Sequence, residues 1–273
     1  MRHPLIAIAI ATTAAFASAS ASAAGGASFS TDTCRYDYST PFDVDVTAAG
    51  LSFHRTDGSP AKVFLHDGTL RVDGKPVAVS DADAVALRRY EDGVRKLVPE
   101  VAAIAREGVS MSYEAMTSVT LTFAEGDQRA EILEKLKRKQ ADSLRSIDEG
   151  IGAGHWSSNR MAETVAGSVS DGVGELVGSV TSSAVTAALS GDTSKVAALQ
   201  ARADSLDKSL NREMNKRSRA LESRTATICP RLDALAELQR AWKVRLPDGK
   251  PLELMTIKPK HSSDNDHDKV ASF

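Results

Sequence analysis

A histidine and a tryptophan stand side by side in a glycine-rich stretch between Gly150 and Ser158. Such a pair can contact a ligand, because the imidazole exchanges hydrogen bonds and the indole offers an apolar ring. A simpler interpretation makes His155 and Trp156 a loop contact, with Trp156 folded back onto neighbouring helices. We favour this loop anchor and keep ligand contact as the alternative.

The rest of the chain holds no recognisable catalytic motif. It contains neither the G-x-S-x-G of serine hydrolases nor the G-x-x-x-x-G-K-[ST] of phosphate-binding loops. The acidic run from Asp264 to Asp268 resembles the start of a calcium loop, but the sixth-position Gly and twelfth-position Glu are missing. We therefore predict that the protein is not an enzyme, with no catalytic residue, metal site or cofactor.

Two cysteines, Cys34 and Cys229, lie near opposite ends of the chain. An even pair in an oxidising compartment most simply forms a disulfide, although two free thiols or half of a metal site are alternatives. Two cysteines without neighbouring histidines make a poor metal site. We predict a structural disulfide that tethers the N-terminal region to the far end of the helical region and stabilises the fold by at most roughly 5 kcal/mol.

The first 23 residues have the order of a secretory signal peptide. Arg2 and His3 precede an apolar stretch from Leu5 to Phe16, and Ala21-Ser22-Ala23 supplies the A-x-A cleavage pattern. The apolar stretch is too short to cross a hydrocarbon layer of roughly 30 Å. We predict cleavage near residue 23 or 24 and a periplasmic protein.

The charge is nearly balanced, with 34 Lys and Arg against 36 Asp and Glu. A dedicated nucleic-acid-binding protein carries a basic excess, so we predict no nucleic-acid partner. Aromatic residues make up only 5% of the chain, which favours close-packed helices.

Residues 34–79 alternate between apolar and polar and contain three Asp-Gly dipeptides, at residues 57, 67 and 73. Asp-Gly matches the type I′ hairpin turn, because both residues accept a positive φ. We predict a small antiparallel β-meander in which residues 62–66 pair with 69–72, followed by a strand at 76–79.

The apolar spacing becomes helical after Ser80, which can cap the amide of Asp83. Pro99 should kink or divide this helix, and Gly108 should end it. Residues 109–125 fit either a strand or a helix, and we favour a helix. Residues 127–149 form another helix, which the flexible loop at 150–158 should end.

The segment 160–190 carries a face of small residues. Such a face lets another helix approach closely, so a packed core helix is the leading interpretation and oligomer contact or membrane-surface binding are alternatives. The face includes Ala166, Ser170, Gly174, Gly178, Ser182 and Thr186, of which Gly174, Gly178 and Ser182 are the candidate packing or interaction residues.

The longest periodic run covers residues 193–243 and is typical of a coiled-coil-like helix. Arg217 and Arg224 interrupt its apolar stripe, which predicts a shallow or partly open packing seam. After it we expect a final strand within residues 246–258, at Leu252–Ile257, and a disordered tail at residues 260–273.

The order of these features resembles the YggN-like family of proteobacterial periplasmic proteins, a domain of unknown function. The resemblance rests on Cys34 after the leader, the hairpin Leu70–Gly74, the capped helix with Arg88, Arg89 and Tyr90, the Gly-rich segment in the helical middle, and Cys229 in a long helix. It does not cover the chain beyond Trp242. The family implies the periplasm and no known activity.

Together these observations predict an α+β fold that is mostly α, with a small N-terminal antiparallel β-meander packed against a long-helix hairpin or bundle. The helical region should cover residues 80–245. For function we predict a non-enzymatic envelope interaction or chaperone-like module that acts through its long helices on another envelope protein or by self-association. The alternative is a membrane-surface or lipid-binding protein that uses residues 160–190.

Overall fold

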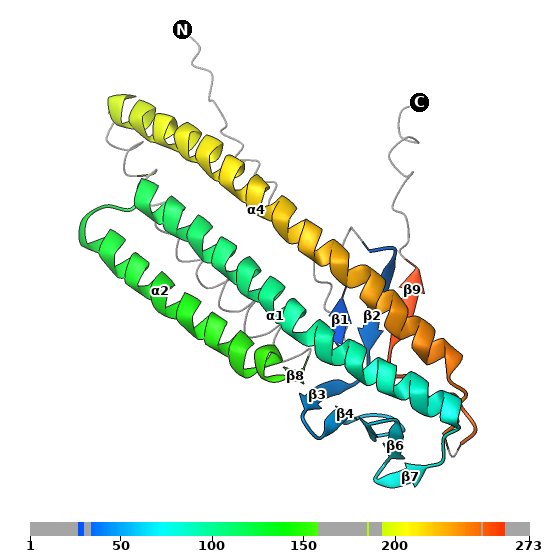
Figure 1. The fold of residues 1–273 in the computed structure, drawn as a ribbon. Helices are drawn as coiled ribbons and strands as arrows, with labels where there is room; N and C mark the ends of the chain where they lie inside the picture. Colours follow the sequence, from blue (N-terminus) through cyan, green and yellow to red (C-terminus); the bar gives the residue numbers. More distant parts are fainter. Residues whose placement is uncertain (1–26, 30–33, 158–184, 186–192, 247, 260–273) are drawn as a thin grey trace, which may run out of the picture.

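The computed structural model describes residues 27–29, 34–157, 185, 193–246 and 248–259. The fold is α+β and mostly α, as the sequence predicts. Three long helices run side by side, and two small sheets pack near one end of them (Figure 1). We call the end beside the sheets the base, and the part of the helices that extends beyond the sheets the arm.

The larger sheet contains the predicted meander. Its consecutive antiparallel strands are β3 (Asp43–Thr47), β4 (Gly50–His54), β5 (Lys62–His66), β6 (Thr69–Val72) and β7 (Lys75–Val77). The pairing of β5 with β6 around Asp67-Gly68 is confirmed. Alternate residues such as Leu51, Phe53, Val63 and Leu65 are buried, because successive side chains of a strand face opposite sides of the sheet.

Two of the three Asp-Gly turns have the predicted conformation. Asp67 and Asp73 have φ values of 44° and 48°, and Gly68 and Gly74 follow at 76° and 80°. The prediction is wrong at Asp57-Gly58, where only the glycine has a positive φ. A longer loop joins β4 to β5 there, because the Arg55 side chain donates hydrogen bonds to the carbonyl oxygens of Ser59 and Pro60.

A second, three-stranded sheet joins the two ends of the described chain. Its order is β1 (Ala27–Phe29), β2 (Tyr36–Thr40), β9 (Thr256–Pro259), all antiparallel. The expectation that the residues after Cys34 belong to the meander is therefore wrong for β2. The last strand also begins later than predicted, because Leu252 and Leu254 are core residues and the Gln239 side chain binds the backbone of Leu254 and Met255.

The first helix, α1 (Asp81–Phe123), begins where the sequence predicts, since the Ser80 hydroxyl accepts a hydrogen bond of 3.1 Å from the Asp83 amide. It neither divides at Pro99 nor ends at Gly108, so the expected division and the expected end are wrong, while a kink at Pro99 stays a prediction. Apolar residues on both sides of Gly108 are buried, and this packing outweighs the weak helix propensity of one glycine. The preference for helix over strand after residue 109 is confirmed up to Phe123.

The second helix, α2 (Gly126–Glu149), returns along α1. The expected flexible loop after it is instead a short 3-10 helix, η1 (Ile151–Ala153), and a two-residue strand, β8 (His155–Trp156), which pairs with β3. Gly154 permits this pairing: it has a φ of 90°, and a Cβ there would collide with the Val46 carbonyl oxygen. Ile151 is fully buried beneath the turn.

The third long helix, α4 (Thr193–Ala241), packs against α1. Its buried residues begin at Thr225, whereas Leu206, Leu210 and Met214 on the arm are only half-buried. Near the base, α4 approaches α1 closely at Gly93, where a Cβ would lie 2.7 Å from Leu235 Cδ2. A coiled-coil geometry for α4 stays a prediction.

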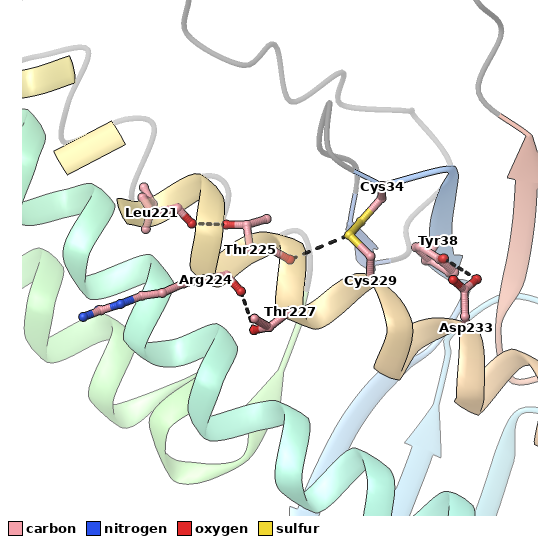
Figure 2. Close-up of a disulfide and its surroundings, with 8 residues drawn as sticks. All are labelled: Cys34, Tyr38, Leu221, Arg224, Thr225, Thr227, Cys229 and Asp233. Atoms are coloured by element: carbon pink, nitrogen blue, oxygen red, sulfur yellow. Dashed lines mark hydrogen bonds between the residues drawn. A yellow bond between two sulfur atoms is a disulfide. The ribbon is translucent and has the colours of Figure 1, made fainter. Parts of the chain in front are cut away.

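The predicted disulfide joins Cys34 to Cys229, with 5.4 Å between the two Cα atoms (Figure 2). It attaches the chain before β2 to a point inside α4 and not to the helix end, because the helix continues through Pro230 to Ala241. The tether therefore lies close to where α4 passes from the arm to the base. A disulfide indicates an oxidising, exported environment.

Several predicted features lie outside the described residues. They are the signal peptide, the small-residue face with Gly174, Gly178 and Ser182, and the tail at residues 260–273. Among the helices that the structure describes, none has the length and apolar character needed to cross a membrane.

Candidate functional site

The two sheets, α1 and α4 line a cavity of about 100 Å³ at the base, open to solvent on one side, which we call the junction cavity. The inner faces of β2, β3 and β4 contribute Tyr38, Val44 and Phe53, and α1 contributes Tyr90 and Val94. These side chains are all buried and present carbon to the cavity. The remaining lining residues are Ser39, Thr40, Leu97, Val98, Trp156, Leu232, Leu235, Leu254 and Met255.

Polar links around the cavity hold its walls in place. The Tyr38 hydroxyl donates a 2.7 Å hydrogen bond to Asp233 Oδ1 on α4, one turn from the disulfide (Figure 2). The Thr40 hydroxyl donates to the Leu254 carbonyl oxygen at 2.6 Å. Burial, and then the hydrogen bond to Asp233, raise the pKa of Tyr38, so its hydroxyl stays protonated and remains the donor.

The structure separates His155 from Trp156, although they are adjacent in the sequence. Neighbouring residues of a strand face opposite sides of the sheet, so Trp156 lines the junction cavity while His155 lies on the outer face. There His155 Nδ1 is 2.7 Å from Asp45 Oδ1, and His54 Nδ1 is 3.4 Å from Asp45 Oδ2. The pair therefore cannot contact one small ligand together.

The His155, Asp45 and His54 group is not a metal centre. Within the part of the chain that the structure describes, no group of three or more His, Cys, Asp or Glu side chains is arranged to hold a metal ion. The absence of a cofactor stays a prediction.

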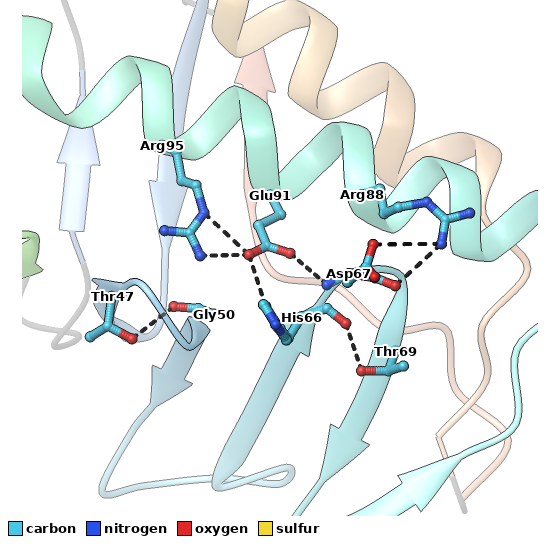
Figure 3. Close-up of polar contacts among 8 residues, drawn as sticks. All are labelled: Thr47, Gly50, His66, Asp67, Thr69, Arg88, Glu91 and Arg95. Atoms are coloured by element: carbon cyan, nitrogen blue, oxygen red, sulfur yellow. Dashed lines mark hydrogen bonds and ion pairs between the residues drawn. The ribbon is translucent and has the colours of Figure 1, made fainter.

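A buried carboxylate, Glu91, connects α1 to the hairpin between β5 and β6 (Figure 3). It accepts hydrogen bonds from Arg95 at 2.6 Å and from the Asp67 amide at 2.9 Å, and His66 Nδ1 lies 3.4 Å away. Burial by itself would raise the pKa of Glu91, but the hydrogen bonds from Arg95, Asp67 and His66 outweigh it and lower the pKa. The group joins helix to sheet and does not face the cavity.

A second concave surface lies at the far end of the arm, between the end of α1, the start of α2 and α4. We call it the tip groove; its volume is about 450 Å³. Leu121, which is 51% exposed, and the half-buried Leu206 form its apolar part. The other lining residues are Thr122, Arg129, Arg202, Ser205 and Ser209.

Ion pairs connect α4 to the other helices along the arm. Arg217 contacts Glu107 at 2.9 Å and also Glu114, both on α1. Arg202 lies 3.3 Å from Glu125 in the turn between α1 and α2. The arm thus keeps α4 beside α1 with charged contacts where the apolar residues of α4 are only half-buried.

Sequence reasoning missed the junction cavity and the tip groove. Tyr38 and Asp233 are 195 positions apart, and no local pattern marks them as partners. Arg129 and Arg202 read as ordinary charges of two solvated helices. The sequence did predict that the apolar side of α4 is only partly covered, because Arg217 and Arg224 interrupt its apolar residues.

The fold defines a class: a disulfide-tied α+β protein with an arm of long helices, in whose described residues no group of His, Cys, Asp or Glu side chains is arranged to hold a metal ion. Comparison with known families identifies the chain further. The family of proteins of unknown function DUF2884 matches residues 37–255, and the chain belongs to it. No curated protein and no solved structure matches the chain significantly.

Proposed function

We propose that this protein is a non-enzymatic interaction module of the bacterial periplasm that binds another exported protein in the tip groove. The disulfide, the leader expected at residues 1–23 and the resemblance to YggN-like periplasmic proteins support export to that compartment. The main support for partner binding is the groove of about 450 Å³ at the end of the arm, far from the sheets.

The lining of the tip groove indicates the chemistry of the partner. The exposed Leu121 and the half-buried Leu206 offer apolar contact, and apolar surface left open to solvent is typical of interaction sites. Arg129 and Arg202 add positive charge, while no carboxylate is among the described lining residues. We therefore infer a partner segment with an apolar side chain flanked by Asp or Glu.

The arm supports this role because it holds the groove away from the base. The hydrophobic core is continuous from the sheets into the arm, where it includes Tyr113, Met116 and Ile132. A partner can still reach the tip groove, because Leu121 is exposed there.

Arg129 and Arg202 are held in place at the groove, because Arg129 donates to the Ala124 carbonyl oxygen at 2.6 Å and Arg202 lies 3.3 Å from Glu125. A chaperone-like action, in which several clients use the same groove, would need these contacts to exchange for contacts with each client.

Site-specific photo-crosslinking in living cells tests the proposal. A photoreactive residue at Leu121 should capture an exported protein, and one at Val85 should not. Val85 is the matched control, since it is also an apolar residue on α1, is 41% exposed and lies near the sheets. The captured protein would be identified by mass spectrometry and its affinity measured in purified form.

Charge reversal at the two arginines of the tip groove is the second part of this test. The double variant Arg129→Glu, Arg202→Glu should weaken binding of the purified partner by about tenfold or more, through lost attraction and added repulsion. Arg138→Glu with Arg145→Glu is the control, because it makes the same charge change on the exposed surface of α2. Equal weakening by both variants, or a crosslink from Leu121 only to residues 160–190 of the same chain or to a second copy, would contradict the proposal.

A further inference from the structure

The junction cavity lies at the opposite end of the molecule from the tip groove and is a separate site. We propose that it binds the end of an alkyl chain, with the polar head of the ligand at the cavity mouth beside Trp156. The inference does not depend on the proposed partner of the tip groove, because no residue lines both surfaces.

The cavity is built into the fold and is not a local packing fault. Protein interiors seldom leave a void larger than a water molecule, and an apolar cavity of about 100 Å³ destabilises the protein that contains it. Here the walls cannot simply move together. The disulfide and the Tyr38–Asp233 hydrogen bond fix β2 to α4, and Thr40 is bound to the backbone at Leu254.

The wall formed by Leu254 and Met255 is also fixed in place. The Gln239 side chain accepts hydrogen bonds from the Leu254 and Met255 amides at 2.8 and 2.9 Å and donates one of 2.6 Å to the Met255 carbonyl oxygen. A polar frame around an apolar interior is the arrangement of a preformed binding site, because the ligand need not reorganise the walls.

The lining residues identify the mouth. Those on α1 and α4 are buried, whereas Ser39, Thr40 and Trp156 are half-buried and mark the side that reaches solvent. Trp156 lies on β8, an edge strand of two residues. Its indole N–H has no hydrogen-bond acceptor among the described residues, so it can donate to the head of a ligand.

The chemistry of the interior sets the ligand class. Leu, Val, Phe and Tyr carbons line it, so an ionised or strongly hydrated group would lose its water without gaining partners. An apolar cavity of about 150 Å³ holds the six carbons of benzene, so a cavity of about 100 Å³ accommodates on the order of four chain carbons, and the carbon next to the polar head lies at the mouth. A carboxylate or hydroxyl at the mouth can accept from Trp156 and from the Ser39 hydroxyl.

Chain-length dependence distinguishes this site from general hydrophobic adsorption. Straight-chain carboxylates from butanoate to decanoate would be titrated into the full mature protein while the two tryptophan indole N–H signals are followed by NMR. We expect affinity to rise about threefold to fourfold per methylene up to hexanoate, and then to level off when the cavity is full. The Trp156 signal should move most, because Trp242 is buried and already donates to the Leu252 carbonyl oxygen.

A cavity-filling variant provides the second readout. Val94→Phe should weaken hexanoate binding by about tenfold or more, while Val85→Phe on the exposed face of the same helix should leave it unchanged. If Val94→Phe does not fold, xenon-pressurised crystals of the natural protein supply the measurement, with xenon expected beside Val94 and Val98. Affinity that keeps rising to decanoate, equal binding by the folded Val94→Phe variant, or the absence of xenon from the cavity would overturn the proposal.

Matched titrations then separate the two sources of an alkyl chain. Free octanoate and phospholipid vesicles each present such a chain, the latter within a bilayer. Because the cavity holds only the end of a chain, we expect saturable binding of free carboxylate and none of vesicles. Binding to vesicles that Val94→Phe leaves unchanged would contradict a role for the cavity in lipid contact.

Discussion

At the scale of single residues, two buried carboxylates connect α1 to segments that are distant in the chain. Glu91 and Asp83 are both buried carboxylates on α1. Glu91 binds the β5–β6 hairpin, and Asp83 accepts a hydrogen bond of 2.8 Å from the Lys243 amide just after α4. That hydrogen bond is the main cause of the lowered pKa of Asp83. Burial acts in the opposite direction and raises the pKa, whereas the hydrogen bonds with Ser80 lower it further. Each contact is therefore strongest while its carboxylate is ionised.

Glu91→Gln tests this at one position. We expect the substitution to cost about 1–3 kcal/mol of unfolding free energy at neutral pH, because it weakens charge-assisted hydrogen bonds to a buried group. Glu134→Gln is the control: this carboxylate is 58% exposed and pairs with Arg138 one turn away in α2, so its loss should cost less than about 0.5 kcal/mol. Urea denaturation at a series of pH values would measure both.

The pH dependence of the difference follows from the direction of the pKa shift. The folded pKa of Glu91 is lower than its ordinary value, so its contribution to stability is complete above about pH 4.3 and is lost as pH falls through the folded pKa. The gap between the natural protein and Glu91→Gln should therefore close in acid. A gap that stays constant from pH 7 to strong acid would show that the charge of Glu91 does not stabilise the fold.

At the scale of elements, β8 is a short strand with a large effect on the base. Its residues pair with only two positions of β3, yet they place Trp156 at the junction cavity and His155 on the opposite face. Gly154 connects η1 to β3 through its backbone. Its amide donates to the Ile151 carbonyl oxygen at 3.0 Å, and its carbonyl oxygen accepts from the Val46 amide at 2.8 Å.

Gly154→Ala should detach β8 from β3. A positive φ costs a non-glycine residue about 1–3 kcal/mol, and the new methyl group would also collide with the Val46 carbonyl oxygen. Gly74→Ala separates the two effects, since Gly74 has a φ of 80° but no atom lies within 4 Å of its Cβ position. We expect Gly154→Ala to be the more destabilising of the two in urea and to accelerate hydrogen exchange in β3. If the two variants lose the same unfolding free energy, the close approach of β8 to β3 does not stabilise the fold.

At the scale of the whole molecule, the disulfide and the second sheet connect both ends of the chain to α4. Cys34 precedes β2, and β2 pairs with β9 from the C-terminal end. The closed loop spans 195 residues, so the cross-link restricts the unfolded chain strongly. It also holds β2 over the junction cavity, which links the tether to the proposed alkyl-chain site.

Removing the tether should loosen the three-stranded sheet before the helices melt. We expect the Cys34→Ser, Cys229→Ser variant to lose at most roughly 5 kcal/mol of stability. Hydrogen exchange should accelerate first in β2 and β9, while far-UV circular dichroism still reports intact helices. A reducing agent should not change the variant further. Equal thermal stability of the oxidised and reduced natural protein would show that the tether does not stabilise the fold.

The sequence by itself determined the elements whose signals are local. Alternation and Asp-Gly pairs located the meander, Ser80 located the start of α1, and the cysteine count predicted the disulfide. Each depends on the conformational preference of a few neighbouring residues or, for the cysteines, on there being just one partner available. The same local rules failed at Gly108, where packing against neighbouring helices outweighs the propensity of a single residue.

Only the tertiary structure decided which surfaces exist. It moved β2 into a sheet with β9, turned Trp156 toward a cavity and His155 away from it, and brought Arg129 and Arg202 together at the tip. These features depend on contacts between residues far apart in the chain, such as Tyr38 with Asp233 and Thr40 with Leu254. A local pattern carries no information about such pairs, because the free energy that selects them comes from the packing of the complete core.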